Sequence, residues 1–243
     1  MALVKLELLQ ALASLFYPPV CTICSSSIEP SEYLCDDCEA KTPRISPPFC
    51  ATCSEPFSGA ISGSFTCANC AHRRLYFETA VAVYRSRGIV RRVVHEFKYS
   101  HQVHLRHLVG RWLRAALDDE RLRDREFDVI VPVPLHPARQ RERGFNQASL
   151  LALALRDRVA APIKPLLERV RYKTTQTAFD RSERMENLHG AFRLRRKTDV
   201  QGLRVLLIDD VLTTGATLSE CARVLKRAGA GSVHAATAAR LPE

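Results

Sequence analysis

Eight of the nine cysteines form four Cys-x-x-Cys pairs within residues 21–70. They are Cys21/Cys24, Cys35/Cys38, Cys50/Cys53 and Cys67/Cys70. Two residues between cysteines let both thiolates converge from one tight turn, and four thiolates complete a tetrahedral Zn²⁺ site. The spacing therefore predicts two structural zinc sites. Pairing in sequence order is the simplest assignment, and a crossed arrangement that joins Cys21/Cys24 to Cys50/Cys53 is the alternative.

A disulfide framework or a redox-active pair would use the same cysteines differently. Residues 1–17 are largely apolar, but Lys5 and Glu7 interrupt them and no small-residue cleavage site follows. We therefore expect a short docking helix rather than a secretory signal, and a cytoplasmic location whose reducing conditions disfavour disulfides. The segments between the cysteine pairs are rich in turn-forming residues, so a metal must supply part of their folding free energy. Cys221 stands apart in a predicted helix, where we expect a buried, inert thiol.

A second group of polar residues follows an apolar run near residue 205. Two adjacent carboxylates precede hydroxyls and a glycine at the expected start of a helix: Asp209, Asp210, Thr213, Thr214, Gly215 and Thr217. Backbone N–H groups, hydroxyls and the helix dipole at such a position bind a phosphate dianion. The carboxylates can accept hydrogen bonds from sugar hydroxyls. The pattern predicts a site for a phosphorylated sugar at the carboxyl end of a strand, and a threonine-rich helix cap is the alternative.

The hydrophobic pattern from residue 76 onward alternates between strands and helices. Strands are expected at 79–84, 128–134, 202–208 and 232–237, and helices at 88–99, 105–117, 146–158 and 218–228. Such alternation predicts an α/β fold with a parallel sheet covered by helices on both faces. The chain then divides into a docking helix at 1–19, a double zinc ribbon at 20–75 and an α/β domain at 76–243.

The charge is concentrated in one part of the chain. The 243 residues include 36 Lys+Arg and 26 Asp+Glu, a formal net charge of +10, and residues 136–197 hold 15 basic against 6 acidic side chains. This surplus favours nucleic acid or a phosphorylated small molecule as partner, and a solvated basic surface is the alternative. The composition is that of a globular protein, and the absence of a run of about 20 apolar residues argues against a membrane span.

These motifs carry a resemblance. The segment LIDDVLTTGAT at 207–217 resembles the 5-phosphoribosyl-1-pyrophosphate (PRPP) loop of type I phosphoribosyltransferases. The cysteine pairs, with FKY at 97–99, VPVPL at 131–135, RGFNQA at 143–148 and ENLHGAF at 186–192, resemble the ComF family of competence and DNA-uptake proteins over nearly the whole chain. The resemblance implies a type I phosphoribosyltransferase fold with an N-terminal double zinc ribbon, in which four cysteines hold each zinc.

The resemblance also implies roles for individual residues. Asp209 and Asp210 would contact the ribose hydroxyls of PRPP, the hydroxyls and glycine at 213–217 would hold its 5-phosphate, and Mg²⁺ would arrive with PRPP because it prefers oxygen ligands. Pyrophosphate is expected beside the loop at 135–146, and a hood at 171–187 would close over the site. The candidates near pyrophosphate and the hood are Lys98, Arg139, Arg141, Arg143, Lys173, Gln176, Arg181, Arg184 and Asn187.

One departure narrows the function. Hypoxanthine-guanine transferases carry a third Asp where this chain has Thr213, so purine salvage of that type is not expected, and no segment resembles a nucleobase pocket. Three classes remain: an active phosphoribosyltransferase with an unidentified acceptor, a single-stranded DNA-binding module with Phe145 and Tyr172 stacking on bases, and a scaffold whose ribbons recruit a partner. We expect a cytoplasmic protein that binds PRPP with Mg²⁺ and acts in uptake or use of single-stranded DNA, with DNA-uptake proteins as partners.

Overall fold

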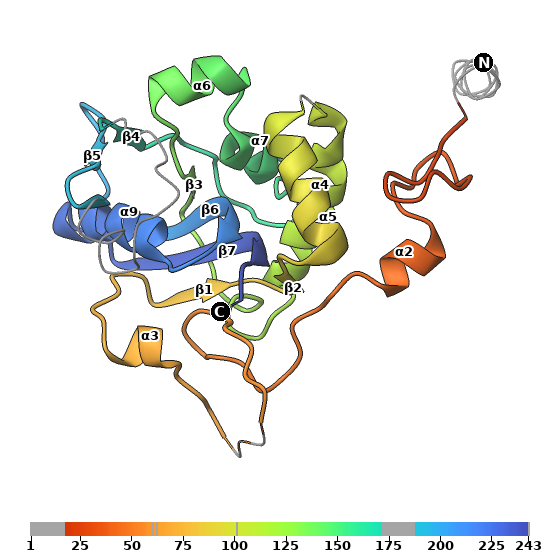
Figure 1. The fold of residues 1–243 in the computed structure, drawn as a ribbon. Helices are drawn as coiled ribbons and strands as arrows, with labels where there is room; N and C mark the ends of the chain where they lie inside the picture. The colour runs from red at the N-terminus through yellow and green to blue at the C-terminus, as the bar shows by residue number, and fades with distance from the viewer. Residues whose placement is uncertain (1–17, 60, 62, 101, 172–187, 243) are drawn as a thin grey trace.

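The computed structural model describes residues 18–59, 61, 63–100, 102–171 and 188–242 (Figure 1). Its centre is a parallel sheet with the strand order β1–β7–β6–β3, and β2 also pairs with β7. The strands are β1 (Thr79–Val81), β2 (Tyr84–Arg85), β3 (Val129–Pro132), β6 (Arg204–Leu212) and β7 (Ser232–Arg240). A separate antiparallel pair joins β4 (Leu167–Arg169) to β5 (Phe192–Leu194). The α/β fold with a parallel sheet is therefore confirmed.

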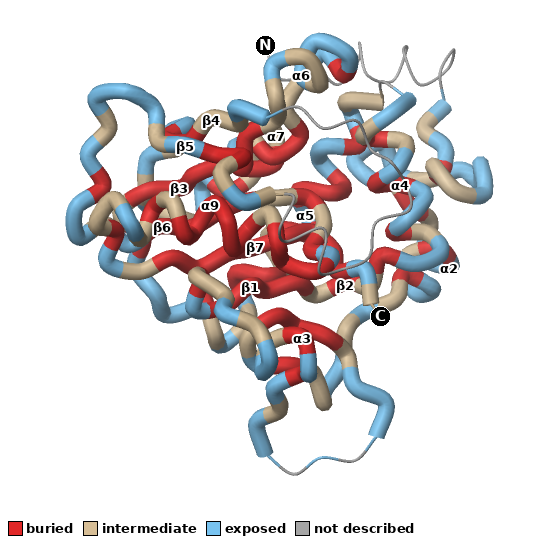
Figure 2. The backbone as a smooth tube through the Cα atoms, turned by 60° about the vertical axis from the view of Figure 1, so that its left-hand side comes forward, coloured by how far each residue is buried: buried red, intermediate tan, exposed pale blue. Residues whose placement is uncertain are grey.

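Helices cover both faces of this sheet. One face packs against α4 (Gly88–Tyr99), α5 (Arg106–Leu117) and α7 (Gln147–Leu153), and the other packs against α9 (Ala216–Arg227). The short elements are α2 (Asp36–Ala40), α3 (Ala68–Ala71), the 3₁₀ helix η1 (Val103–Leu105) and α6 (Pro137–Arg143). Figure 2 shows the buried residues following the strands and the inner sides of the covering helices. No helix in the described part of the chain has both the length and the apolar character needed to cross a membrane.

The alternation of side chains along β6 separates two cores. Leu206 and Ile208 lie in the core under α4, α5 and α7, whereas Val205 and Leu207 lie in the core under α9. All four side chains are fully buried. Because successive residues of a strand point to opposite faces, the same alternation directs the side chains that follow in β6 to different sides of the sheet.

The central strand is longer than its sequence pattern indicates. We expected a strand at 202–208 that ended at the acidic pair, but β6 continues to Leu212. Its last residues pair with β7, in the register Asp209↔Thr237, Val211↔Ala239 and Leu212↔Arg240. Pairing with a neighbouring strand outweighs the low strand propensity of aspartate, so both acids lie within the strand.

Two further differences lie near the expected pyrophosphate loop. Residues 137–143 form α6, which begins at Pro137 and whose first N–H groups are capped by the His136 side chain, 3.2 Å from the Ala138 nitrogen. The helix expected at 146–158 ends at Leu153. The residues after it form turns with i→i−3 hydrogen bonds, such as that from the Leu155 nitrogen to the Ala152 oxygen. A proline at a first helical turn is a helix-start signal that our loop assignment overlooked.

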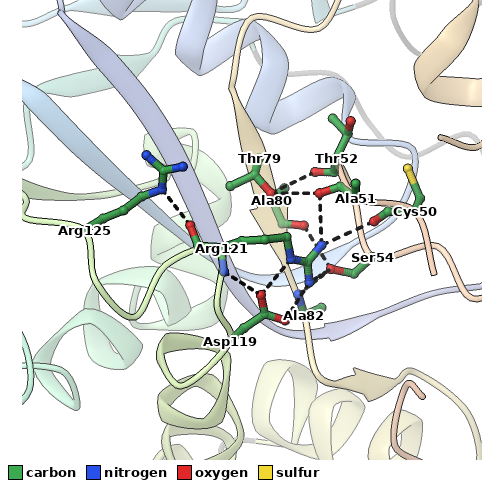
Figure 3. A network of polar contacts seen from close by, with 10 residues as sticks. All are labelled: Cys50, Ala51, Thr52, Ser54, Thr79, Ala80, Ala82, Asp119, Arg121 and Arg125. Carbon is green, nitrogen blue, oxygen red and sulfur yellow. Dashed lines mark hydrogen bonds and ion pairs between the residues drawn. The ribbon is translucent and has the colours of Figure 1, made fainter. Parts of the chain in front are cut away.

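The cysteine-rich segment makes two lobes that contact the α/β domain at different places. The first lobe places Leu34 against the core of α4 and α5, and the second holds the backbone next to β1 through the hydrogen bond from the Ala80 nitrogen to the Thr52 oxygen, at 2.7 Å. Arg121 joins the second lobe to the domain, since it donates to the carbonyls of Cys50 and Ala51 while its charge pairs with Asp119 (Figure 3). The docking helix expected at 1–19 lies, apart from its two final prolines, outside the described residues.

Candidate functional site

The cysteine thiols form two separate groups of four. Cys21, Cys24, Cys35 and Cys38 make one group, and Cys50, Cys53, Cys67 and Cys70 make the other. Within each group the sulfur atoms lie within 4.8 Å of one another, and one pair in each is 3.6 Å apart. A tetrahedral zinc with Zn–S bonds of about 2.3 Å separates its sulfurs by about 3.8 Å, so both groups fit Zn²⁺. The pairing follows sequence order rather than the crossed alternative, while Cys221 is buried in α9 as expected.

The expected phosphate loop lies between the end of β6 and the start of α9. Gly215 is the residue before α9 and has a left-handed backbone with φ of 79°, while a Cβ built on it would lie 3.4 Å from the Phe77 ring. The left-handed backbone favours glycine at this position, while the Phe77 distance is an ordinary van der Waals contact. The Thr214 side chain is buried, whereas Thr213 is exposed and Thr217 is partly exposed. The first N–H group of α9, on Ala216, donates to the Thr214 hydroxyl at 3.4 Å. A helix start with several hydroxyls beside it suits a phosphate.

The two carboxylates of β6 have different surroundings. Asp210 is 3% exposed, and one of its oxygens lies 2.8 Å from the Nζ atom of Lys98 at the end of α4. Asp209 is partly buried and accepts a hydrogen bond from the Asp210 backbone nitrogen at 2.9 Å. Burial, together with the neighbouring Asp210 charge, raises the pKa of Asp209 to about 7. A cation or hydroxyl donors beside Asp209 would therefore stabilise the charged form of its carboxylate.

The arginines of α6 divide between two places. Arg139 donates to the Tyr99 hydroxyl at 3.2 Å, and the Arg143 guanidinium lies 5.0 Å from the centre of the Tyr99 ring. Arg143 is 8% exposed and donates to the Gln147 side chain at 2.6 Å, and burial lowers its pKa. Arg141 points elsewhere, into a cavity of about 530 Å³. The structure thus pairs Lys98 with Asp210 and gathers Arg139 and Arg143 at Tyr99, with Arg143 close enough to feel the charges of the acidic pair. Arg141 lies apart from them in the cavity.

The residue that the sequence reasoning missed is Arg169 of β4. Its Nε atom is buried and has no hydrogen-bond partner among the described residues, and its guanidinium lies 5.5 Å from the centre of the Phe192 ring. Burial lowers the pKa of Arg169, with the Asp209 charge acting in the opposite direction. It lines the same cavity as Arg141, Gln140 and Arg195. The signal available in the sequence was only its membership of the basic stretch.

The remaining candidates are placed as follows. Lys173, Gln176, Arg181, Arg184 and Asn187 lie outside the described residues, as does Tyr172. The Phe145 ring lies 5.4 Å from the Phe97 ring and packs against the core under α4, so the stacking role expected for it is not favoured by this packing. The described part of the site therefore consists of the acidic pair of β6, the loop before α9 and the cations of α4, α6 and β4.

Comparison with known proteins gives matches over most of the chain. Residues 12–71 match the family described as a double zinc ribbon domain, and residues 106–243 match the family described as a phosphoribosyl transferase domain. The chain is 32% identical to the DNA utilization protein YhgH of Salmonella typhimurium over 221 residues, which cover 89% of this chain and 95% of that protein. It is 29% identical to competence protein F of Haemophilus influenzae, over 83% of this chain and 87% of that protein.

One more curated relative and one solved structure are also similar to this chain. The competence protein ComFC of Bacillus subtilis is 28% identical over 240 residues, which cover 91% of this chain and 95% of that protein. Among solved structures, a purine phosphoribosyltransferase from Pyrococcus horikoshii is 19% identical over 52% of this chain and 69% of its own, with a TM-score of 0.34.

Proposed function

This chain belongs to the ComF family of competence and DNA-utilization proteins, and from that premise we propose that it binds PRPP with Mg²⁺ and acts in the uptake or use of single-stranded DNA in the cytoplasm. The observation that supports the ligand is the juxtaposition at the end of β6. Two carboxylates precede the hydroxyl-rich start of α9, and Lys98 lies 2.8 Å from one of them. A phosphorylated sugar needs both kinds of group within a few ångströms.

The geometry suggests different tasks for the two acids. Asp210 is already neutralised by Lys98, so it holds that lysine in place, while Asp209 is left to meet the ribose hydroxyls. The 5-phosphate would be bound by the loop of Thr213, Thr214, Gly215 and Thr217. Carboxylate and hydroxyl oxygens suit Mg²⁺ as ligand atoms. The raised pKa of Asp209 fits a site beside which Mg²⁺ would bind, because a nearby cation favours the charged carboxylate. When bound with PRPP, Mg²⁺ would neutralise pyrophosphate charge.

A second candidate function is an active phosphoribosyltransferase with an unidentified acceptor. The cavity of about 530 Å³ that Arg169 lines favours it, because Arg141, Arg169 and Arg195 outnumber Glu168, the one carboxylate among the described residues of its lining. Gln140 adds an exposed amide group that could orient an acceptor. An acceptor of this site would therefore carry an anionic group such as a carboxylate or phosphate.

The proposed contact with single-stranded DNA is supported by the exposed cations of the basic stretch. Arg141, Lys164, Arg195, Arg196 and Lys197 are all exposed and leave their charge available to phosphates. Arg143 is buried and engaged with Gln147 and Tyr99, so we assign it to packing between α4, α6 and α7 rather than to DNA. The names of the relatives place them in competence and DNA utilization, which supports DNA and DNA-uptake proteins as partners of this chain too.

Calorimetric titration tests the ligand. PRPP should bind in the presence of Mg²⁺ and much more weakly without it. Undetectable binding under both conditions would overturn the ligand proposal. Pyrophosphate release over a panel of anionic acceptors then decides the second candidate function, because a protein that only binds PRPP releases none.

Fluorescence anisotropy with a labelled single strand tests the DNA contact. Arg141→Ala with Arg195→Ala should weaken binding of all sequences alike and flatten the salt dependence, by roughly 0.7 log unit per lost contact for each tenfold change in salt. The matched control removes the same charge from two exposed positions outside the basic stretch, Arg91→Ala with Arg123→Ala. Equal affinities and slopes for the two double variants would assign the basic stretch to a solvated surface.

A further inference from the structure

The second cysteine group touches the phosphate loop directly. The Asn69 side chain, between Cys67 and Cys70, donates to the Thr214 carbonyl at 3.3 Å. Glu55, two residues after Cys53, accepts a hydrogen bond from the Nε atom of Arg240 at 2.6 Å. Asn69 therefore contacts the phosphate loop directly, and Glu55 contacts a residue that binds the loop.

Arg240 connects Glu55 to the loop. It lies at the end of β7, is 0% exposed, and donates from Nη1 to the Thr213 carbonyl at 3.1 Å. Glu55 is 7% exposed and supplies the negative charge that this buried guanidinium requires. A buried cation that loses its partner is strongly unfavourable, and it either moves or draws water into the site. Movement of Arg240 removes the donor that holds Thr213, and water in the site competes for it.

The backbone that carries Glu55 depends on the metal ligands. Four thiols hold the turns on either side of it, and Arg121 fixes the adjoining Cys50 and Ala51 carbonyls at 3.3 and 3.1 Å (Figure 3). Segments this rich in turns have little core of their own, so their geometry relies on the bound metal. Loss of metal would release Glu55 and Asn69 together.

The first cysteine group provides a natural contrast. Its lobe contacts α4 and α5, through Arg111 with Glu32 at 2.7 Å and through Arg92 with the Ile23 carbonyl at 3.4 Å. Among the described residues, no recorded hydrogen bond or ion pair links this lobe to residues 213–217. The two clusters have the same chemistry but different neighbours.

We propose that the second zinc cluster is part of the ligand site, with Glu55 and Asn69 as positioning residues that hold the phosphate loop through Arg240 and Thr214. Ligand affinity then depends on metal at the second cluster and not at the first. The expected effect on PRPP affinity rests on the proposed function, whereas the expected effect on the order of the phosphate loop does not. Because coupling between two sites is reciprocal, a phosphorylated ligand should also raise the affinity of the second cluster, and not of the first, for zinc.

The experiment compares full-length zinc-loaded variants by two measurements. Hydrogen exchange of residues 211–220 reports the order of the loop, and calorimetry with PRPP and Mg²⁺ reports affinity. Cys53→Ser should raise exchange in the loop and weaken PRPP binding, while Cys24→Ser should change neither. Glu55→Gln and Asn69→Ala keep all eight thiols, and we expect each to weaken PRPP binding by about tenfold, with Glu55→Asp restoring most of the loss because the charge is kept.

The outcomes separate the two proposals. Wild-type protein that fails to bind PRPP overturns the ligand assignment, and loop exchange still decides the positioning role. Should Cys53→Ser fail to fold, Glu55→Gln and Asn69→Ala decide it alone. Loop exchange that stays at the wild-type level in both of these variants would refute the inference, as would equal effects of Cys53→Ser and Cys24→Ser.

Discussion

Replacing Asp209 by asparagine should make the protein more stable and less able to bind its ligand. The acid is partly buried beside Asp210, and its pKa is raised to about 7 from an ordinary 3.8. In its charged form it therefore opposes folding. Asparagine removes the charge while its side-chain oxygen can still accept the hydrogen bond from the Asp210 nitrogen.

The size of the effect follows from the pKa. Each pKa unit corresponds to about 1.4 kcal/mol, so the charged form of Asp209 lowers the free energy of unfolding by at most about 4 kcal/mol. Asp209 is partly exposed, and solvent weakens the repulsion. We therefore expect Asp209→Asn to raise the free energy of unfolding by about 1 to 3 kcal/mol above neutral pH.

The pH dependence gives the sharper test. With a raised pKa, Asp209 keeps its proton in the folded protein at low pH, and the stability that this proton confers is lost as the pH rises through about 7. The difference between variant and wild type should be close to zero near pH 4 and reach its full value above pH 7. Urea denaturation across this range measures it.

The variant Asp210→Asn shows whether the effect of Asp209→Asn comes from the loss of its charge or from a general disturbance of the site. Asp210→Asn leaves the largely buried Lys98 without its partner and should destabilise the protein instead. Asp209→Asn should also lose Mg²⁺-dependent PRPP binding. A destabilising Asp209→Asn whose effect is the same at every pH would refute the reasoning.

Three other outcomes can be checked with simple variants. Metal analysis of protein prepared without chelator should give two zincs per chain, with Cys221→Ala leaving that number unchanged, and a value near zero would exclude both sites. Gly215→Ala forces a side chain onto a left-handed backbone against Phe77, so we expect thermal unfolding to show a loss of about 1 to 2 kcal/mol and calorimetry to show weaker PRPP binding. Gly110→Ala places a Cβ 2.8 Å from the Ala154 Cβ and should push α5 away from α7, at a cost of about 1 to 3 kcal/mol in urea denaturation, whereas an unchanged midpoint would show that the contact is relieved at no cost.

The sequence pattern predicts an element correctly where the residues that determine its structure lie within the element itself. The spacing of Val90, Val93, Val94 and Phe97 predicts α4 with both ends correct, because those residues form one apolar side of a helix. The Cys-x-x-Cys pairs predict two groups of four for a similar reason, since the turn that brings two thiols together is local.

Features that depend on distant residues were not predictable in this way. The extension of β6 to Leu212 depends on β7, and the position of Arg143 depends on Tyr99, which is 44 residues away in the sequence. Arg169 entered the site because β4 pairs with β5, which brings a residue of the basic stretch toward Asp209. The sequence contains the right residue types here, but their partners are fixed only by the tertiary fold.

The position of β7 within the sheet bears on the order of folding. This strand comes last among the described strands, yet it pairs with β1, β2 and β6 and so joins the two halves of the sheet. Its final contact, from Arg240 to Glu55, spans 185 residues of sequence. Contacts of such long range require loops to close before they contribute stability, and they slow folding. A nascent chain on the ribosome can therefore form its helices and cysteine turns early, but the sheet and the phosphate loop become complete only after residue 240 has been released.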